Sequence, residues 1–555
     1  MIFAQIVAGF LSLALAQMPA DHPTVSMSPE QALSALTTQG LKIGTDEIRR
    51  VAVTQNGRVK PLDSLARETI LFLIGSYGRW GMSPVQLYLA LPTTEGAELA
   101  PIVEIRDVKL RTRLGYLRDK RFFSYNELAA SELGNLAQPL LQKQEEGGKL
   151  KSTEKAVTEA FSQMALLQQL MNGNHFLQSV DFSFLNNNHG QASGSQVAPV
   201  AGEYLAMIKQ NPVQAGLLAQ ELVRLSREQE TPDLFKHYLQ KLDAEIFYNN
   251  LRPFLIAALL SILFGLLFVV DVTRKKISKP LATGLYLAAV LPLMVGIGFR
   301  VYITQFAPVT NMYTTMLWVA LGVVVFGLAL FYLYENYAVS GFLLISSGLI
   351  LMLTEKIPLI LSPDMDPIVA VLRSNFWLST HVTTITISYA AFTIAMILGN
   401  VALFKIWRTG DHSAFIKEYS HYAYRMIQLG CFLLSVGIIL GGVWADYSWG
   451  RFWGWDPKET WALIADMGFL ALLHARFVGW VKPFTLLALS PVAYLLVIMA
   501  WYGVNFILAA GLHSYGFSSG GAAMVGIYVT VQVAFISASL YKARHLWKSV
   551  PATGT

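Results

Sequence analysis

The sequence predicts a polytopic α-helical membrane protein with about nine transmembrane helices, preceded by a mostly helical exported domain. Of its 555 residues 54% are hydrophobic and only 14% are charged, which is too apolar for an ordinary soluble protein. The charged residues also avoid a series of long apolar runs in the second half of the chain. The net charge of +6 could suggest a nucleic-acid partner. However, the basic residues cluster beside the apolar runs, as membrane topology signals do, so we exclude nucleic acid.

The N-terminus has the features of an export signal. Residues 1–17 (MIFAQIVAGFLSLALAQ) are apolar, are too short to span a membrane comfortably, and end in an A-x-A-like ALA. This pattern indicates either a signal peptide cleaved near Ala16, although the usual basic start is missing, or an uncleaved anchor. In both cases residues 18–250 form an exported (periplasmic) domain. Segments such as STEKAVTEAFSQMALLQQLM have apolar residues three and four apart, which predicts helices, and NNNHGQASGSQ (186–196) predicts a loop.

Residues 251–555 are expected to form the transmembrane domain. Each of nine apolar runs is close to the ~20 residues that cross ~30 Å of hydrocarbon. The expected spans are 253–270, 280–299, 313–334, 337–354, 381–404, 426–445, 459–475, 484–511 and 521–541. Nine crossings place the C-terminus on the side opposite the exported domain.

The distribution of basic residues predicts the same orientation. The loops expected to be cytoplasmic carry thirteen lysines and arginines, whereas the opposite loops carry five. By the positive-inside rule the exported domain lies outside, which predicts a multi-pass protein of the bacterial inner (cytoplasmic) membrane.

One outer loop is unusually rich in tryptophan. WADYSWGRFWGWDPKETW (444–461) contains Trp444, Trp449, Trp453, Trp455 and Trp461. Tryptophans at a membrane boundary commonly form an interfacial belt, and this would account for Trp444 or Trp461 alone. A belt does not explain five indoles in one loop, interleaved with glycines, aspartates and a proline. We interpret the loop as an apolar platform for a planar macrocycle.

Two histidines flank this loop in sequence at the same expected membrane level. His381 begins an inward-running helix and His513 ends an outward-running one. A lone histidine at a helix end is more often structural, but two at matched depth beside an aromatic loop predict a bis-histidine haem-iron site. His474 lies fifteen residues after Glu459, or ~22 Å along the helix, and therefore near the inner side. It has no evident histidine partner in a neighbouring span. Asp466, within the same span, is expected to face a polar cavity, and its role stays open.

These motifs resemble a known family of haem-handling membrane proteins. WGRFWGWDPKETW resembles the tryptophan-rich WWD signature of cytochrome c biogenesis proteins. With WLSTHV before it, GLHSYG after it and APVTNMY at 307–313, the chain is similar to the CcsA (ResC) member of the system II cytochrome c synthase over about residues 250–545. Thr314 replaces a glutamate that often follows that tyrosine. The upstream NGRVKPLDSLARET (56–69) and RFFSYNEL (121–128) resemble the exported part of fused CcsB–CcsA synthases.

The resemblance implies a function and roles for individual residues. His381 and His513 correspond to the outer ligand pair of haem b, and His474 corresponds to the intramembrane ligand, whose partner histidine lies in a CcsB-type subunit. The implied activity is haem export and covalent attachment of haem to the CxxCH cysteines of apocytochrome c, that is, a cytochrome c haem lyase. Because the lone cysteine Cys431 lies within a span, reduction of the thiols would come from an external thiol-reductant protein.

Further assignments are less direct. Asp456 and Lys458 are expected to shape the loop, while Arg300 and Arg451 are candidates for binding haem propionates. Two alternative functions stay open at this point. One is a haem exporter or chaperone without ligase activity, and the other is a respiratory cytochrome b-like subunit that transfers electrons.

Overall fold

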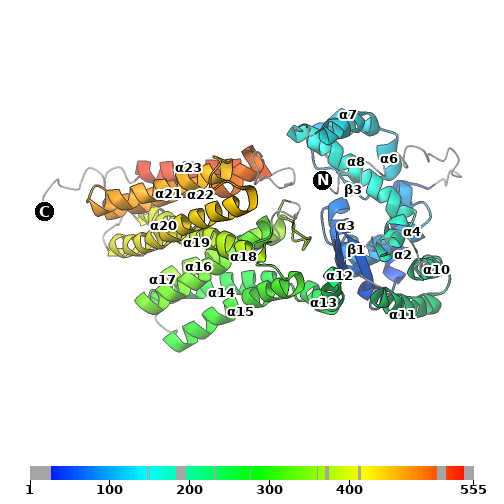
Figure 1. Ribbon diagram of the computed structural model, residues 1–555, viewed down its shortest axis with the longest axis horizontal. Helices are drawn as coiled ribbons and strands as arrows, with labels where there is room; N and C mark the ends of the chain where they lie inside the picture. The colour runs from blue at the N-terminus through cyan, green and yellow to red at the C-terminus, as the bar shows by residue number, and fades with distance from the viewer. Residues whose placement is uncertain are drawn as a thin grey trace. The chain divides into compact units, whose positions relative to one another are not determined.

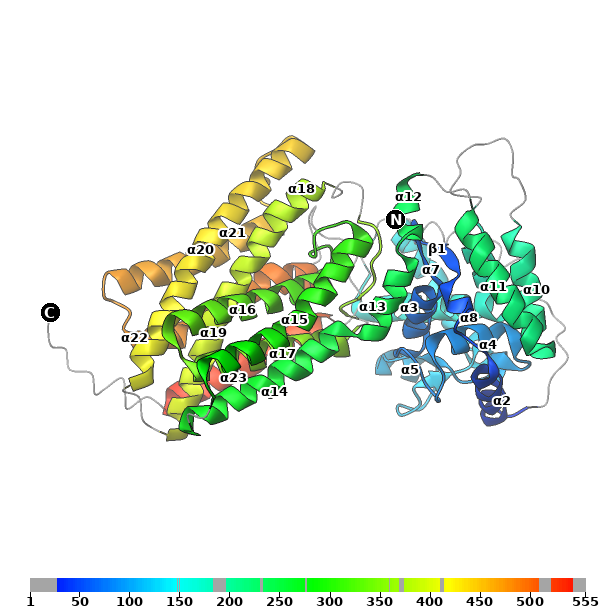
Figure 2. The ribbon, with the colours of Figure 1, turned by 90° about the horizontal axis from the view of Figure 1, so that it is seen from below.

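The computed structural model describes residues 27–146, 148, 150–182, 196–229, 233–274, 277–358, 360–368, 374–409, 414–508 and 521–542. The expected signal (1–17), most of the loop at 186–196 and His513 lie outside these residues. The chain forms two compact units, one of residues 1–251 with 364–367 and one of residues 252–363 with 368–555. Figures 1 and 2 show the elements of both units.

The first unit is mainly helical. Its short strands form two antiparallel two-stranded sheets, β1 with β2 and β3 with β4. The strands are β1 (Ala52–Gln55), β2 (Arg58–Pro61), β3 (Val103–Glu104) and β4 (Phe122–Phe123). The helices are α2 (Pro29–Lys42), η1 (Ile48–Arg50), α3 (Leu62–Ile74), α4 (Pro84–Thr93), η2 (Ala97–Leu99), α5 (Val108–Arg113), α6 (Tyr125–Ala129), α7 (Leu133–Glu145), α8 (Ser152–Met171), α9 (Asn174–Val180), α10 (Val197–Gln210), α11 (Pro212–Glu228), α12 (Asp233–Leu239) and α13 (Leu242–Leu251).

The NGRVKPLDSLARET motif forms the β1–β2 hairpin and the start of α3. Asn56 and Gly57 both have positive φ (52° and 72°), as a two-residue hairpin turn of the Asn-Gly type requires. Beyond the turn, the side chains of Arg58 and Lys60 are completely buried. A buried cation needs a paired acid, and Arg58 pairs with Glu245 of α13.

Lys60 is paired in the same way. It forms an ion pair with Glu68 of α3, and its Nζ lies 3.7 Å from Asp366 Oδ1. Asn56 Nδ2 donates to the other oxygen of Asp366 at 3.0 Å. Residues 364–367 come between α17 and α18 in sequence but are part of the first unit, and Asp366 is bound there by this hairpin.

The second unit consists of long apolar helices. They are α14 (Pro253–Arg274), α15 (Lys279–Thr304), α16 (Met312–Tyr334), α17 (Tyr337–Lys356), α18 (Asn375–Trp377), the π-helical η5 (Leu378–Val382), α19 (Thr383–Thr409), α20 (Ala414–Trp449), α21 (Pro457–Phe477), α22 (Pro483–Ile498), the π-helical η6 (Met499–Leu508) and α23 (Gly521–Lys542). Within the described residues eight helices are long and apolar enough to cross a membrane. The expected polytopic helical membrane fold is therefore confirmed.

One of the nine expected spans, 459–475, forms the 21-residue helix α21 but is not among those eight. Its apolar character is reduced by Asp466, His474 and Arg476. It packs against α20, α22 and η6 as an integral part of the bundle. Helix α20 is also much longer than its expected span of 426–445, because polar residues continue the helix at both ends.

The helices of this unit pack as two groups. Helix α14 packs along α15 and α17, and α17 also packs along α16, as Figure 2 shows. Helix α19 packs against α20 and α22 and also touches α16, which joins the groups. Gly265 and Gly341 allow α14 and α17 to approach closely, since a Cβ on either would lie 2.7 Å from the carbonyl oxygen of the other. Cys431 is buried within α20, as expected of a packing residue.

Candidate functional site

The tryptophan-rich segment is only partly a loop. Residues 444–449 complete α20, and the non-helical part is limited to 450–456. Gly450, at a φ of +68°, ends α20 while its N–H donates to the carbonyl of Asp446 at 2.9 Å. Asp456 then caps α21, its carboxylate accepting from the backbone N–H of Lys458 at 2.9 Å. These two caps fix where the loop begins and ends.

Glu459 holds the loop in shape. Its Oε2 accepts hydrogen bonds from the backbone N–H groups of Gly454 (2.8 Å) and Asp456 (3.1 Å). Its Oε1 lies 3.0 Å from Nη1 of Arg451, whose guanidinium also lies over the ring of Trp449 at 5.6 Å. One carboxylate thus connects both halves of the loop to the first turn of α21. Glu459 is not among the residues predicted for the site, although the D-P-K-E capping-box pattern indicates this role.

The five tryptophans occupy three different elements. Trp444 and Trp449 belong to α20, Trp461 belongs to α21, and the loop itself carries Trp453 and Trp455. The two loop rings meet edge to face, with centroids 5.7 Å apart. Trp455 is 70% exposed, whereas Nε1 of Trp453 is buried without a hydrogen-bond partner among the described residues. A buried indole N–H without an acceptor is a donor available to a bound molecule.

His381 lies in a notch on the surface of α20. Its segment, η5, is π-helical, a local geometry that is frequent at functional sites. The imidazole Nδ1 lies 2.8 Å from the carbonyl oxygen of Gly437, and the ring meets Trp444 edge to face at 5.8 Å. The notch exists because residue 441 is glycine: a Cβ there would lie 2.5 Å from Cε1 of His381. Gly441 is not among the residues predicted for the site, although the Gly-Gly pair at 441–442 is a visible signal in the sequence.

The contact with Gly437 fixes the tautomer of His381. A carbonyl oxygen can only accept, so Nδ1 carries a proton, and in the neutral imidazole Nε2 then carries the lone pair. Histidines that bind metals usually donate their other N–H in this way, often to a backbone carbonyl. The same pattern occurs at His474, whose Nδ1 lies 2.8 Å from the carbonyl oxygen of Leu470. His474 is exposed on α21.

His513 lies outside the described residues, but the helix that leads to it is described. Gly399 of α19 contacts Leu487 and Pro491 of α22. Thr393 Oγ1 is 2.8 Å from the hydroxyl of Tyr494. Further along, the rings of Tyr389 and Trp501 are 5.5 Å apart. Residues progressively nearer the N-terminus of α19 therefore contact residues progressively nearer Leu508 on α22 and η6. The two helical segments run antiparallel.

Arg300 and Asp466, also singled out from the sequence, are both buried among the helices of the second unit. Arg300 is 2% exposed, and its guanidinium lies 5.0 Å from the ring centroid of Tyr313. That tyrosine in turn donates to Glu355 at 2.5 Å. Asp466 is buried and accepts a hydrogen bond from Ser435 of α20 at 2.6 Å.

Thr314, which departs from the pattern of the resembled family, has a local role. The side chain of Asn311 accepts from the backbone N–H of Thr314 at 2.9 Å, and the Thr314 hydroxyl oxygen accepts from the backbone N–H of Asn311 at 3.0 Å. This reciprocal pair caps the N-terminus of α16. A glutamate at the same position of a capping box would accept the same backbone N–H, so the helix start is preserved.

Taken together, these elements define a multi-pass helical membrane protein in which a tryptophan-lined loop and a histidine notch lie at one end of α20. Comparison with known proteins agrees with this description. Residues 309–513 match the model of the cytochrome C assembly protein family. The chain is 32% identical over 302 residues to the cytochrome c biogenesis protein CcsA of Guillardia theta, covering 96% of that protein and 49% of this chain. It is 35% identical to the protein NrfI of Wolinella succinogenes over 297 residues, which is 50% of this chain but only 31% of NrfI.

The chain therefore belongs to the CcsA family of cytochrome c biogenesis proteins. Its function is in cytochrome c biogenesis, and it is a multi-pass membrane protein. The matched residues 309–513 include the histidine notch, the tryptophan-rich segment and both expected outer ligands.

Proposed function

We propose that this protein exports haem across the membrane and attaches it covalently to the CxxCH cysteines of apocytochrome c, acting with a CcsB-like membrane subunit. The observation that carries the proposal is the notch at His381. There the Gly437 carbonyl fixes the tautomer that presents Nε2, and Trp444 borders the ring. This arrangement suits a neutral imidazole ligand of haem iron.

Haem is the substrate, and the outer site holds it during the reaction. His381 and His513 bind the iron from opposite faces, and the register between α19 and η6 supports their being at the same end of the bundle. The indoles of Trp453 and Trp455 cover the edge of the ring, and the buried Nε1 of Trp453 donates to a propionate. Arg451, held at the loop by Glu459, is a second propionate partner.

The site faces the outer, periplasmic side in this proposal. Four of the candidate spans, which contain α14 to α17, lie between residue 242 and residue 356, and an even number of crossings returns the chain to its starting side. Residues 364–367 belong to the unit formed by residues 1–251, which supports a common side for the first unit and the loop after α17. The excess of basic residues on the other loops favours the outside for that side.

The ligation step needs reduced thiols and a well-positioned haem. Each cysteine thiol of the apocytochrome adds across one vinyl group: a C–S bond forms at one vinyl carbon, and the thiol proton ends on the other. No net oxidation occurs, so no further electron donor enters this step. The protein contributes orientation. A haem whose iron is held by two imidazoles keeps its vinyl groups in one position relative to the bound peptide. Cys431 is buried in α20 and takes no part, and an external reductant protein keeps the CxxCH thiols reduced.

His474 marks the point of entry. It is exposed on α21 and its Nδ1 is engaged by the Leu470 carbonyl, which suits an Nε2 iron ligand whose partner imidazole comes from another subunit. We assign that partner to a CcsB-like helix. Haem b bound there passes to the outer site.

The test is formation of thioether-linked cytochrome c in cells that lack their own maturation system. The full chain is produced with a CcsB-like partner and an apocytochrome, and covalent haem is detected on a denaturing gel. A covalent product that requires His381 supports the synthase. Bound haem without covalent product favours a haem exporter or chaperone. Rapid quinol-driven reduction of bound haem, with no product, favours a cytochrome b-like subunit.

A further inference from the structure

A second candidate binding site lies far from the tryptophan-rich loop. It is a cavity of about 640 Å³ lined by Lys417, Ser420, His421, Tyr424, Arg476 and Pro483. Three elements form it: the N-terminal part of α20, the last turn of α21 and the start of α22. Tyr424 and Trp444 are twenty residues apart on α20, which corresponds to ~30 Å along the helix. The cavity is therefore about one membrane thickness from the histidine notch.

The lining has an excess of positive charge. Lys417 and Arg476 are both cationic, and no lining residue is acidic. Glu418 is the acidic neighbour of Lys417 on α20, but it does not line the cavity. Its carboxylate accepts hydrogen bonds from Asn336 at 2.8 Å and from Tyr422 at 2.6 Å. Within the described part of the chain neither Lys417 nor Arg476 forms an ion pair, and Arg476 Nη1 donates only to the carbonyl of Val481, at 2.9 Å.

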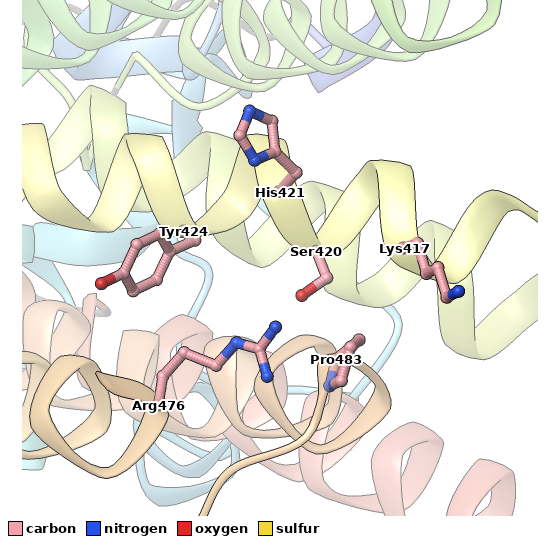
Figure 3. Close-up of a pocket in the computed structure, with 6 residues that line it drawn as sticks. All are labelled: Lys417, Ser420, His421, Tyr424, Arg476 and Pro483. Atoms are coloured by element: carbon pink, nitrogen blue, oxygen red, sulfur yellow. The ribbon is translucent and has the colours of Figure 1, made fainter. Parts of the chain in front are cut away.

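The lining of the cavity includes several groups that can donate hydrogen bonds to an anion. Figure 3 shows the guanidinium of Arg476 extending from α21 toward Ser420 of α20, with Tyr424 and Pro483 on either side. The planar guanidinium binds carboxylate or phosphate in a two-point geometry, and the hydroxyls can add single donors. Lys417 adds a further positive charge to the lining, with its amine directed away from Arg476 in this view. His421 points away from Arg476 in this view, and its Nε2 lies 3.2 Å from the hydroxyl of Tyr334.

Large apolar side chains directly follow Arg476 in sequence. Phe477 is 81% exposed, Val478 56% and Trp480 83%. Exposed aromatic groups beside basic residues are typical of the membrane–water boundary, where an amphipathic molecule places its acidic group in water and its apolar part in lipid. A cationic cavity whose Arg476 is followed in sequence by exposed apolar residues therefore suits an amphipathic anion.

We propose that this cavity binds the acidic end of an amphipathic molecule at the membrane side opposite the tryptophan-rich loop. Two sources have the required chemistry: the propionates of haem before it reaches His474, and the headgroup of an anionic phospholipid. The haem source rests on the proposed function. His474 and Arg476 are two residues apart on one helix, so their side chains point to nearly opposite sides, about 200° apart. The cavity is then a loading site distinct from the iron site at His474.

The experiment compares the double variant Lys417→Gln/Arg476→Gln with a matched control, Arg408→Gln/Arg425→Gln. The control removes two exposed cations from the same end of α19 and α20, outside the cavity lining. The full-length proteins are placed in lipid nanodiscs that contain phosphatidylglycerol and are checked for unchanged helicity by circular dichroism. Ferric haem and its dimethyl ester, which lacks free propionates, are then titrated by absorbance. Bound phosphatidylglycerol is counted by native mass spectrometry.

If haem propionates occupy the cavity, the double variant binds ferric haem about tenfold more weakly than the control, while the dimethyl ester binds both alike. If a lipid occupies it, haem titrations are unchanged and one phosphatidylglycerol is lost from the double variant alone. Equal haem affinity and equal lipid count in both proteins overturn the site. A wild-type protein that binds no haem refutes the proposed function, and the lipid count still decides the cavity. The variant Arg476→Lys keeps the charge without the two-point geometry and is expected to give an intermediate loss.

Discussion

The Nδ1 of His381 lies 2.8 Å from the carbonyl oxygen of Gly437, so the proton of the imidazole is on the nitrogen that faces α20. A helix carbonyl can accept this bond because the π-helical turn of η5 brings the ring against α20 where residue 441 has no side chain. The position of the ring is thus set by backbone atoms of a neighbouring helix rather than by a flexible side chain. This relationship leads to the first two predictions.

Replacement of His381 or His513 by alanine is expected to abolish covalent cytochrome c formation, because either change removes one of the two proposed outer iron ligands. Some haem should stay on the protein through His474. The measurement is thioether-linked product together with the absorption spectrum of the purified protein. His237→Ala, in the first unit, serves as the control and should behave as wild type. Unchanged synthesis in the His381 variant would refute the ligand assignment.

Gly441→Ala tests the notch without touching the ligand. A Cβ at this position would lie 2.5 Å from Cε1 of His381, so the ring must rotate and its bond to Gly437 is lost. We expect the yield of covalent cytochrome c to fall about tenfold while the protein accumulates normally. The matched control is Gly298→Ala in α15, where a Cβ meets nothing within 4 Å. If both variants keep full activity, the notch does not position the ligand.

Glu459→Ala is expected to release the loop. It removes the acceptor for two backbone N–H groups and the partner of Arg451, and hydrogen bonds to a charged group typically contribute about 1.5–3 kcal/mol each. We expect haem to dissociate from the outer site at least tenfold faster, as measured by transfer to an apomyoglobin acceptor. Asp446→Asn, an exposed acid at the end of α20, is the control. Equal dissociation rates in the two variants would show that the loop does not retain haem.

His474→Ala is expected to reduce the haem that arrives at the outer site while leaving the outer ligands intact. Because the lost group is an imidazole, added imidazole should restore part of the haem content and of the covalent product. Both are measured in cells grown with and without imidazole. A variant with normal haem content and normal product without imidazole would exclude His474 from the path.

The first unit has its own pH response. His175 lies 2.7 Å from the hydroxyl of Tyr88, and burial lowers its pKa from 6.5 to about 4, with a smaller contribution from Lys60 in the same direction. Between these two values the unfolded chain binds a proton that the folded chain does not, so stability is unaffected above pH 6.5 and falls as the pH drops toward 4. We expect α4 and α9 to lose hydrogen-exchange protection between pH 7 and pH 5, after correction for the intrinsic exchange rate. His175→Gln should remove this dependence, and a pH dependence that persists in this variant would assign it to another group.

Much of this fold could be predicted from the sequence, because the length of each apolar run and the distribution of basic residues between the loops depend on neighbouring residues alone. The apolar runs predicted the membrane helices, with α21 the exception because Asp466 and His474 dilute its apolar character. The approach of α20 to His381 could not be predicted, since the glycine that permits it is 60 positions away in sequence and carries no chemistry of its own. The extent of the loop also differed from expectation. Trp444, Trp449 and Trp461 are helical, because helix ends are decided by caps at Gly450 and Asp456 rather than by composition.

The hairpin motif around Lys60 has a consequence for dividing this polypeptide. Asp366 is encoded far downstream of residue 251, yet it belongs to the upstream unit through its contacts with Asn56 and Lys60. A gene cut into two at residue 251 would therefore distribute one electrostatic cluster between two products. The upstream product would keep the buried Lys60 but lose the nearby carboxylate of Asp366. The downstream product would carry residues 364–367, which pack with the other product in the intact chain.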